Sequence, residues 1–499
     1  MKKSVFYSII LIASMLMPSC NFLDLHDKDA FEENLFYRTS EDMEGLLASA
    51  YAGLRPAYDK LFFVTEMKSD NATTTDMGTA GGKYYTFVSH TVTSSNDIVA
   101  EIYNSFYICI HRCNLLLEHI DNVNLPDADK NRLRGEALFL RALSHFYLTR
   151  LWGPVTIMRH TVSGSKDALS MTRSSQDEVY AFILNDLHTV VDNNLLPATC
   201  TGDQFGHASG TAACALLGRV YLQYAATLGH PEAYSSVITY LEKAITISGF
   251  TGLTLNYMEI FDMANQTNAE IIFPIMYMPN EAQHSNFATY FQPQSLKDET
   301  STLTGRGFNV GQENLNKDFE KNDKARLSLY RSFSGVYYTK KYVDLVHPSG
   351  YSGNLWYEIR FADVYLMLAE AYERRYSMTN DATDYTNAVT YLDKVRLRIK
   401  STLKGYEIAK TNATYAAAYP TLRAAIFHER RAELCFENQR WFDLMRLYPN
   451  PSDFVNYMQS VNEPGAGSKY TGFQAYELLL PIPYDEVYLN PDLGQNDGY

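Results

Sequence analysis

Apolar residues recur at intervals of three or four along much of the chain, which is the spacing of one face of an α-helix. The clearest stripe covers residues 98–120. A second stretch starts at Asp127, which can cap a helix, and stops at Gly153 and Pro154. Because only a short turn at residues 125–126 separates the two stretches, they should pack as an antiparallel pair.

The same helical pattern returns along the rest of the chain. Ser175 and Glu178 have the spacing of a capping box ahead of another apolar stripe. Gly218 lies in an alanine-rich stretch and would let a neighbouring helix approach closely. Further helices are predicted over residues 39–58, 208–228, 234–247, 356–376, 385–399 and 419–447. Repeated helix pairs of this size favour a mostly α fold that stacks like tetratricopeptide repeats.

Two stretches, 62–96 and 271–352, lack the helical pattern and mix aromatic residues with Gly, Asn and Thr. Long ordered loops on a helical scaffold usually carry function, and the alternative is that they only cover helix ends. We therefore expect one domain over residues 35–499. It would contain an N-terminal helical part (35–260), the loop-rich insertion (271–352), and C-terminal helices with a tail (356–499).

The first residues have the pattern of a targeting segment. Two lysines precede an apolar run that is too short for an ordinary transmembrane helix, and Cys20 follows a small residue. This order predicts a signal peptide over residues 1–19 and a lipidated Cys20 at the start of a polar tether over residues 20–34. Met17 and Ser19 depart from the usual lipoprotein signal, and the alternative is an ordinary signal followed by a chance cysteine.

Composition narrows the possible partners. The chain has 499 residues and a formal net charge of -14. An acidic surface repels phosphate backbones, so nucleic acid is not an expected partner. No later stretch reaches the roughly 18 apolar residues that would cross a membrane, so the mature chain should be soluble and tethered. The 38 tyrosines suit wet binding surfaces, although many would simply pack between helices.

Motifs of catalysis and metal binding are missing from the sequence. There is no H-E-x-x-H, G-x-S-x-G or C-x-x-C pattern. Residues 78–83 resemble a phosphate loop only superficially, because Tyr84 stands where Ser or Thr should bind magnesium. Cys109 and Cys113 share one face of a predicted helix while His111 points elsewhere, which favours core packing. We predict no catalytic residue, no metal site and no cofactor, and the irregular cysteine spacing does not indicate a disulfide scaffold.

Five stretches carry a resemblance to a known family. They are GEALFLRALSHFYLTRLWGPV (135–155), EIRFADVYLMLAEAYER (358–374), YLDKVRLR (391–398), IFHERRAELCFENQRWFDLMRL (426–447) and LLLPIPYDEVYLNPDLGQNDGY (478–499). Together, in this order, they resemble the SusD/RagB family of outer-membrane nutrient-binding lipoproteins. The alternating charges from Glu429 to Arg440 can pair along and between helices, and we interpret them as structural.

The resemblance implies a tetratricopeptide-like helix-pair scaffold with large, irregular, loop-rich insertions, and a role that is not enzymatic. Family members are lipid-anchored at the outer membrane, face the cell exterior and cover a SusC-like TonB-dependent transporter. They capture oligosaccharides or, in some branches, peptides. Our leading hypothesis is glycan capture for import. The alternatives are capture of peptides or other nutrients, a tetratricopeptide-like protein-interaction module, and an unrecognised hydrolase.

The family builds its ligand site mainly from the loop before the second long helix and from the central insertion. The corresponding stretches here are 62–96 and 271–352. Aromatic residues would stack on the ligand, and polar residues would form hydrogen bonds with it. The expected ligand-binding residues are Asp70, Asn71, Lys83, Tyr84 and Tyr85 in the first stretch, and Tyr290, Phe291, Arg306, Phe308 and Asn309 in the second.

One departure from the family pattern affects this site. Family members often place a Trp four residues before the Tyr that corresponds to Tyr103, and this chain has Val99 there. All three tryptophans, Trp152, Trp356 and Trp441, fall within or beside scaffold stretches. A tryptophan platform for sugars is therefore not expected, and Tyr or Phe would have to replace it.

Overall fold

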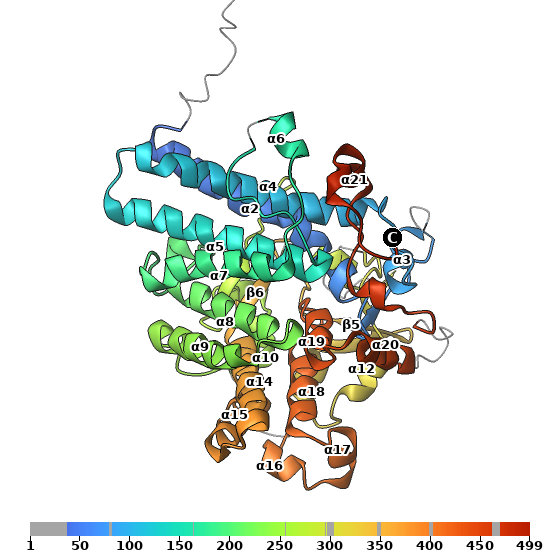
Figure 1. Cartoon of the computed structure of the whole chain (residues 1–499). Helices are drawn as coiled ribbons and strands as arrows, with labels where there is room; N and C mark the ends of the chain where they lie inside the picture. Colours follow the sequence, from blue (N-terminus) through green and yellow to red (C-terminus); the bar gives the residue numbers. More distant parts are fainter. Residues whose placement is uncertain are drawn as a thin grey trace, which may run out of the picture.

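The computed structural model describes residues 37–78, 82–162, 164–254, 256–294, 296, 304–346, 351–398, 403–461 and 470–499. The predicted signal peptide, Cys20 and the tether lie outside these residues. Within the described ranges, long helices stack in successive rows (Figure 1). None of these helices is long and apolar enough to cross a membrane.

The long helices pack in chain order, each against the one before, up to α15. They are α2 (Ser40–Thr65), α4 (Asp97–His119), α5 (Asp127–Trp152), α7 (Gln176–Asp192), α8 (Gly210–Thr227), α9 (Tyr234–Ser248), α14 (Phe361–Thr379) and α15 (Ala382–Arg396). A further helix, α18 (Leu422–Leu434), packs on α14. This arrangement confirms the predicted scaffold of stacked helix pairs.

Local sequence signals explain where several helices begin. Thr39 and Asp42 form a capping box at the start of α2, and Ser175 and Glu178 form the predicted one at the start of α7. Gly218 of α8 lies against α9 so closely that a Cβ atom there would overlap the Leu241 side chain. The close approach predicted for Gly218 is therefore confirmed.

Shorter elements connect the long helices and form the insertion. The short α-helices are α3 (Tyr85–Val88), α6 (Ser165–Leu169), α10 (Tyr257–Ile260), α11 (Phe287–Tyr290), α12 (Glu313–Asp318), α13 (Lys324–Leu329), α16 (Tyr406–Ala409), α17 (Ala413–Ala418), α19 (Arg440–Leu447), α20 (Pro451–Ser460) and α21 (Tyr484–Leu489). The 3-10 helices are η3 (Ile120–Asn122), η4 (Gly202–Gln204), η5 (Pro231–Ala233), η6 (Met263–Asn265), η7 (Ala475–Leu478) and η8 (Pro491–Leu493).

Two predicted helices were wrong in part. Residues Trp356–Arg360 form the strand β6, which pairs antiparallel with β2 (Ile271–Ile275), and the helix starts only at Phe361. All residues of β6 are buried, and a short buried strand has the same apolar pattern as a buried helix. The helix predicted over 419–447 is instead α18 and α19, separated by a turn in which Phe436 and Asn438 adopt positive φ angles.

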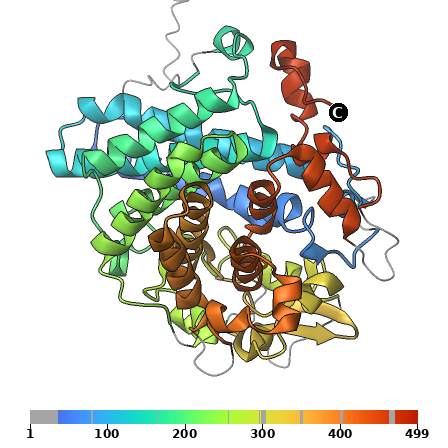
Figure 2. The ribbon, with the colours of Figure 1, turned by 60° about the horizontal axis from the view of Figure 1, so that its bottom comes forward.

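The two loop-rich stretches meet in a small antiparallel sheet of order β1-β3-β5-β4. Its strands are β1 (Ala72–Thr73), β3 (Val310–Gly311), β5 (Val336–Thr339) and β4 (Tyr330–Phe333). The first strand belongs to the stretch before α4 and the others to the insertion, so the sheet joins segments more than two hundred residues apart. Figure 2 shows the yellow strands of the insertion beside the orange C-terminal helices.

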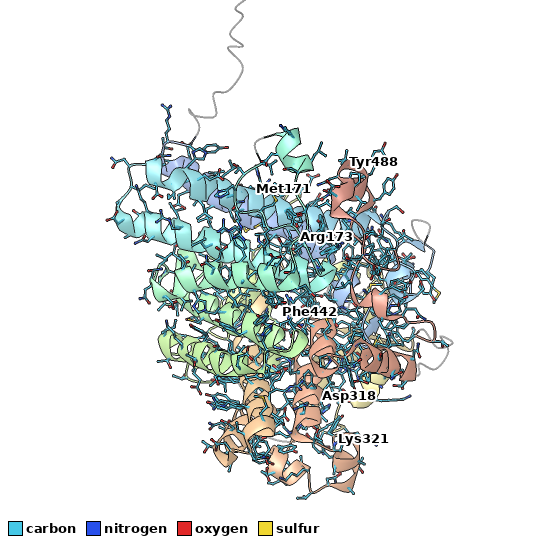
Figure 3. All side chains as sticks on the ribbon, viewed as in Figure 1. Met171, Arg173, Asp318, Lys321, Phe442 and Tyr488 are labelled. Atoms are coloured by element: carbon cyan, nitrogen blue, oxygen red, sulfur yellow. The ribbon has the colours of Figure 1, made fainter. Side chains whose placement is uncertain are left out.

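The C-terminal tail packs across the body of the protein. The Trp152 side chain donates to the Pro481 carbonyl at 2.8 Å, and Asn496 donates to the Trp152 carbonyl at 2.9 Å. Arg173, labelled in Figure 3, donates to the Leu493 carbonyl at 2.7 Å. These bonds fix the tail along the end of α5.

The alternating charges of the C-terminal helices lie inside the protein. Glu433 of α18 accepts from Arg326 at 2.9 Å and Arg360 at 2.7 Å, and lies 3.0 Å from Arg398. All four side chains are buried. The prediction that this charged stretch is structural is therefore confirmed, because its charges join the insertion to the C-terminal helices.

Candidate ligand-binding surface

Several of the predicted ligand-binding residues meet where the two loop-rich stretches adjoin. The Phe308 ring lies 4.5 Å from the Tyr84 ring and 5.1 Å from the Tyr290 ring, measured between centroids. Phe63 of α2 stacks on Tyr84 at 5.3 Å. Phe63 and Phe308 are buried, while Tyr84 and Tyr290 are partly exposed. The rings of Tyr84 and Tyr290 are thus held at the protein surface by packing against buried phenylalanines.

A backbone ladder fixes this arrangement. The Arg306 N–H donates to the Thr289 carbonyl at 2.8 Å, and the Asn309 N–H donates to the Tyr290 carbonyl at 2.9 Å. These bonds align residues 306–309 with the end of α11. They place the Arg306 side chain, which is exposed, near Tyr290. We call the group of Lys83, Tyr84, Tyr290, Arg306 and Phe308 the aromatic surface.

Charged groups border the aromatic surface. Lys83 Nζ lies 2.7 Å from the Asp97 carboxylate and 5.4 Å from the centre of the Tyr84 ring. The hydrogen bond to Asp97 raises the pKa of Lys83, so this side chain is a cation at neutral pH. Burial raises the pKa of Tyr290, so its phenol keeps its proton and can donate a hydrogen bond. The surface therefore combines ring faces with hydrogen-bond donors.

Four other predicted residues are buried inside the protein. The Asp70 carboxylate is buried and accepts from Arg440 and from Tyr457, and Asn71 is held by Glu66 and Arg431. Both side chains are buried and already form hydrogen bonds with protein partners. The other two, Phe291 and Asn309, are buried as well. Tyr85 of α3 is partly exposed and packs against the core.

The aromatic groups at the surface are tyrosine rather than tryptophan. Trp152, Trp356 and Trp441 are all fully buried, and so is Val99. The prediction that the tryptophans belong to the scaffold is confirmed. Any ring stacking on a ligand must therefore use Tyr or Phe.

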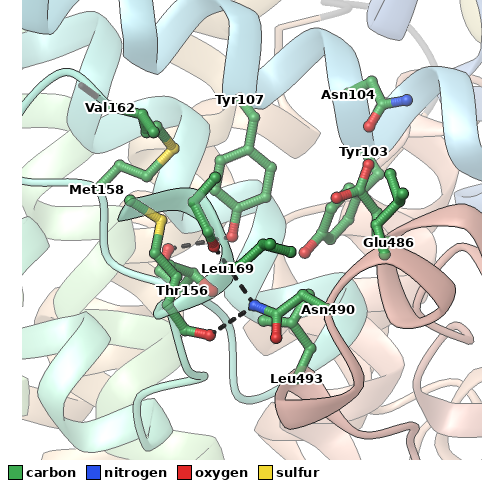
Figure 4. Close-up of a pocket in the computed structure, with 13 residues that line it drawn as sticks. Tyr103, Asn104, Tyr107, Thr156, Met158, Val162, Leu169, Glu486, Asn490 and Leu493 are labelled. Atoms are coloured by element: carbon green, nitrogen blue, oxygen red, sulfur yellow. Dashed lines mark hydrogen bonds between the residues drawn. The ribbon is translucent and has the colours of Figure 1, made fainter. Parts of the chain in front are cut away.

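The sequence did not predict a cavity of about 440 Å³ between α4, the segment around α6, and the C-terminal tail (Figure 4). Tyr103 and Tyr107, one turn apart on α4, form one wall, with ring centroids 4.8 Å apart. Asn490 closes the far side by donating to the Met171 carbonyl at 2.8 Å. The sequence shows Tyr103 and Tyr107 four residues apart, which puts them on one face of a helix. The residues that complete the cavity around them are far away in the sequence, so the cavity could not be predicted.

The cavity is mostly apolar, and Glu486 is the one acidic residue among the described residues that line it. Two leucines that line the cavity are largely exposed, Leu169 at 48% and Leu489 at 66%. Tyr488, labelled in Figure 3, is exposed on the adjacent α21. No group of three or more His, Cys, Asp or Glu that could hold a metal ion occurs in the described ranges.

Comparison with known proteins agrees with this fold. Residues 21–222 match a family model described as "Starch-binding associating with outer membrane", and residues 311–499 match the SusD family model. Between them the two models cover most of the chain. The chain belongs to the SusD/RagB family.

One relative matches the chain over its full length, and another matches about a third of it. SusD-like protein P2 of Formosa agariphila is 25% identical, with 100% of both chains covered. The starch-binding protein SusD of Bacteroides thetaiotaomicron is 29% identical over 33% of this chain and 29% of its own length.

Solved structures of low sequence identity share the fold. A laminarin-binding SusD-like protein has a TM-score of 0.73 at 22% identity, and 93% of this chain and 100% of that chain are covered. Surface glycan-binding protein A from Bacteroides thetaiotaomicron, in complex with laminarihexaose, has a TM-score of 0.74 at 19% identity. This match covers 92% of this chain and 99% of the other.

Proposed function

We propose that the chain is a non-enzymatic, lipid-anchored protein of the outer membrane that captures oligosaccharides and delivers them to a SusC-like TonB-dependent transporter. The observation that carries the proposal is the aromatic surface, in which Tyr84 and Tyr290 are held over Phe308 beside Lys83 and Arg306. Ring faces can cover the apolar faces of sugars, and the flanking donors can bind hydroxyl groups. Relatives named for starch, laminarin and laminarihexaose support a glycan ligand.

Tyr84→Ala and Tyr290→Ala should each weaken glycan binding about tenfold, because each removes a ring face that is already held in place. The measurement is retardation of residues 21–499 in native gels that contain starch, laminarin or other polysaccharides. Tyr488→Ala is the matched control, since Tyr488 is an exposed tyrosine outside the aromatic surface. It should behave like the wild type.

The outcome separates the proposal from its alternatives. Retardation by one glycan class that is lost in both variants supports glycan capture. If no glycan retards the protein and peptides from a mixed pool are retained, the protein would be assigned to peptide capture instead. Release of products from a labelled oligosaccharide would contradict the non-enzymatic role.

Cys20→Ala should leave a folded protein that no longer fractionates with the outer membrane, because the acyl chains that anchor it would have no attachment point. The measurement is membrane fractionation of the full-length chain followed by immunoblotting. Cys200→Ala, which changes a cysteine of the folded body, is the control and should remain membrane-bound. A Cys20→Ala protein that stays acylated in the membrane would refute the lipoprotein assignment.

The transporter partner has a separate test. Purification of the tagged native protein in mild detergent should recover a large barrel protein with it. Recovery of the chain alone would count against the delivery role and leave the binding role unaffected.

A further inference from the structure

Among the residues that the structure describes, Arg150, near the end of α5, has a buried guanidinium but no carboxylate partner. Its side chain is only 3% exposed. Every other buried arginine in the described ranges lies within 4.0 Å of an Asp or Glu oxygen. Arg150 instead donates from Nε to the Phe146 carbonyl at 3.3 Å, and its buried Nη2 has no hydrogen-bond partner in the described part of the chain. An unpaired buried charge is costly, so its retention calls for an explanation.

Aromatic rings account for part of the stabilisation. The Arg150 guanidinium carbon lies 3.8 Å from the Phe146 ring centre and 3.7 Å from the Phe442 ring centre. Phe442, labelled in Figure 3, belongs to α19, which packs against α8. Rings on the faces of a guanidinium attract its charge but form no hydrogen bonds with its in-plane N–H groups. Of these groups, Nη2 of Arg150 has no hydrogen-bond partner among the described residues. Those N–H groups are suited to a planar anion such as a carboxylate.

Arg150 lines a pocket of about 280 Å³ between the helical scaffold and the C-terminal segments. Its polar lining includes Gln176, Gln223 and Thr227, and none of the described residues that line it is Asp or Glu. Glu358, whose charge acts on Arg150, is occupied by Arg219 and by the Tyr147 hydroxyl. A pocket whose one charged group is a cation, in a chain with a net charge of -14, favours an anionic occupant.

The size and walls of the pocket limit the kind of anion. A volume of 280 Å³ corresponds to about nine water molecules of liquid, which is the scale of a monosaccharide. The rings of Tyr180, Tyr448 and Phe454, together with Met445, give the walls a large apolar component. The occupant should therefore combine a negative charge with a compact body that has an apolar face.

We propose that this Arg150 pocket binds a small organic carboxylate of monosaccharide size, with the carboxylate against Arg150 and the body against the aromatic walls. Two sources share this chemistry, namely an acidic sugar and a short aliphatic acid. The pocket shares no residue with the aromatic surface, so it is a second site, and the proposal does not depend on capture of glycans there.

The test is calorimetric titration of residues 21–499 with glucuronate, hexanoate and neutral glucose. We expect binding of at least one carboxylate and none of glucose at this site. Stronger binding of glucuronate would assign the pocket to acidic sugars, and stronger binding of hexanoate would assign it to aliphatic acids. Absence of binding by both carboxylates would overturn the proposal.

Variants connect the binding to the pocket. Arg150→Met should weaken carboxylate binding by about tenfold or more, because a charge-assisted hydrogen-bonded pair is lost. Arg150→Lys keeps the positive charge but loses the planar guanidinium fork. Its affinity for the carboxylate should lie between that of the wild type and that of Arg150→Met. Ala475→Phe, at an exposed position on the pocket lining, should block entry without altering the buried arginine. Carboxylate binding that persists unchanged in Arg150→Met and Ala475→Phe would place the ligand elsewhere and refute the assignment.

Discussion

Glu433→Gln should lower the free energy of unfolding by about 3–5 kcal/mol, the usual cost of breaking a buried ion pair from one side. Glu433 is fully buried, and its carboxylate faces Arg326, Arg360 and Arg398 at 2.7–3.0 Å. Glutamine has the same shape but removes the negative charge, so the three guanidinium groups would remain crowded together in the core. Arg360 and Arg398 also share Glu270, which limits the loss without cancelling it.

Denaturant unfolding of residues 21–499 measures this loss. Glu232→Gln is the matched control, because Glu232 is an exposed carboxylate paired with His230, and it should cost less than about 1 kcal/mol. A cost as small for Glu433→Gln as for Glu232→Gln would mean that the buried cluster does not stabilise the fold.

Acidification supplies a second test of the same cluster. Burial alone would raise the pKa of Glu433, but Arg398, Arg360 and Arg326 outweigh it and hold that pKa well below its usual range. A carboxyl group with a depressed pKa stabilises the fold above its unfolded-state pKa, and this stabilisation is lost as the pH falls below that value. The difference between wild type and Glu433→Gln should therefore be constant near pH 7 and should shrink below about pH 4.5.

Much of the helical scaffold could be predicted because its signals are local. The capping box of Ser175 and Glu178 and the apolar stripe over residues 98–120 depend only on neighbours within a few turns. The strand β6 could not be separated from helix α14 in the same way, because both are buried and apolar. The pairing of β6 with β2, about ninety residues earlier, decides its conformation.

The candidate site was predictable only to the level of segments. The family resemblance indicated the stretches 62–96 and 271–352, and the structure brings Tyr84 and Tyr290 together from them. Whether a polar residue of these stretches is exposed depends on contacts with residues that are distant in the sequence. A single sequence does not reveal those contacts. Neither the cavity beside Tyr103 nor the Arg150 pocket could be inferred, since each is enclosed by segments that are separate in the sequence.

Whether Asp70 stabilises the fold or binds ligand depends on partners that lie far away in the sequence. Asp70→Asn should therefore change stability without changing ligand binding. The Asp70 carboxylate accepts from Arg440 at 2.7 and 2.8 Å and lies 3.1 Å from Arg431, so both partners come from more than 350 residues away. Asparagine would leave these two buried cations without their shared anion. We expect the free energy of unfolding to fall by about 3–5 kcal/mol, as for other buried pairs broken from one side.

Asp97→Asn is the matched control, because the Asp97 side chain is 65% exposed and forms only a surface pair with Lys83. It should cost less than about 1 kcal/mol by the same denaturant measurement. Under conditions in which Asp70→Asn remains folded, its retardation by the glycan that retards the wild type should be unchanged, in contrast to Tyr84→Ala. Loss of retardation with unaltered stability would instead make Asp70 a ligand-binding residue and would require the Arg440 pair to open when the ligand binds.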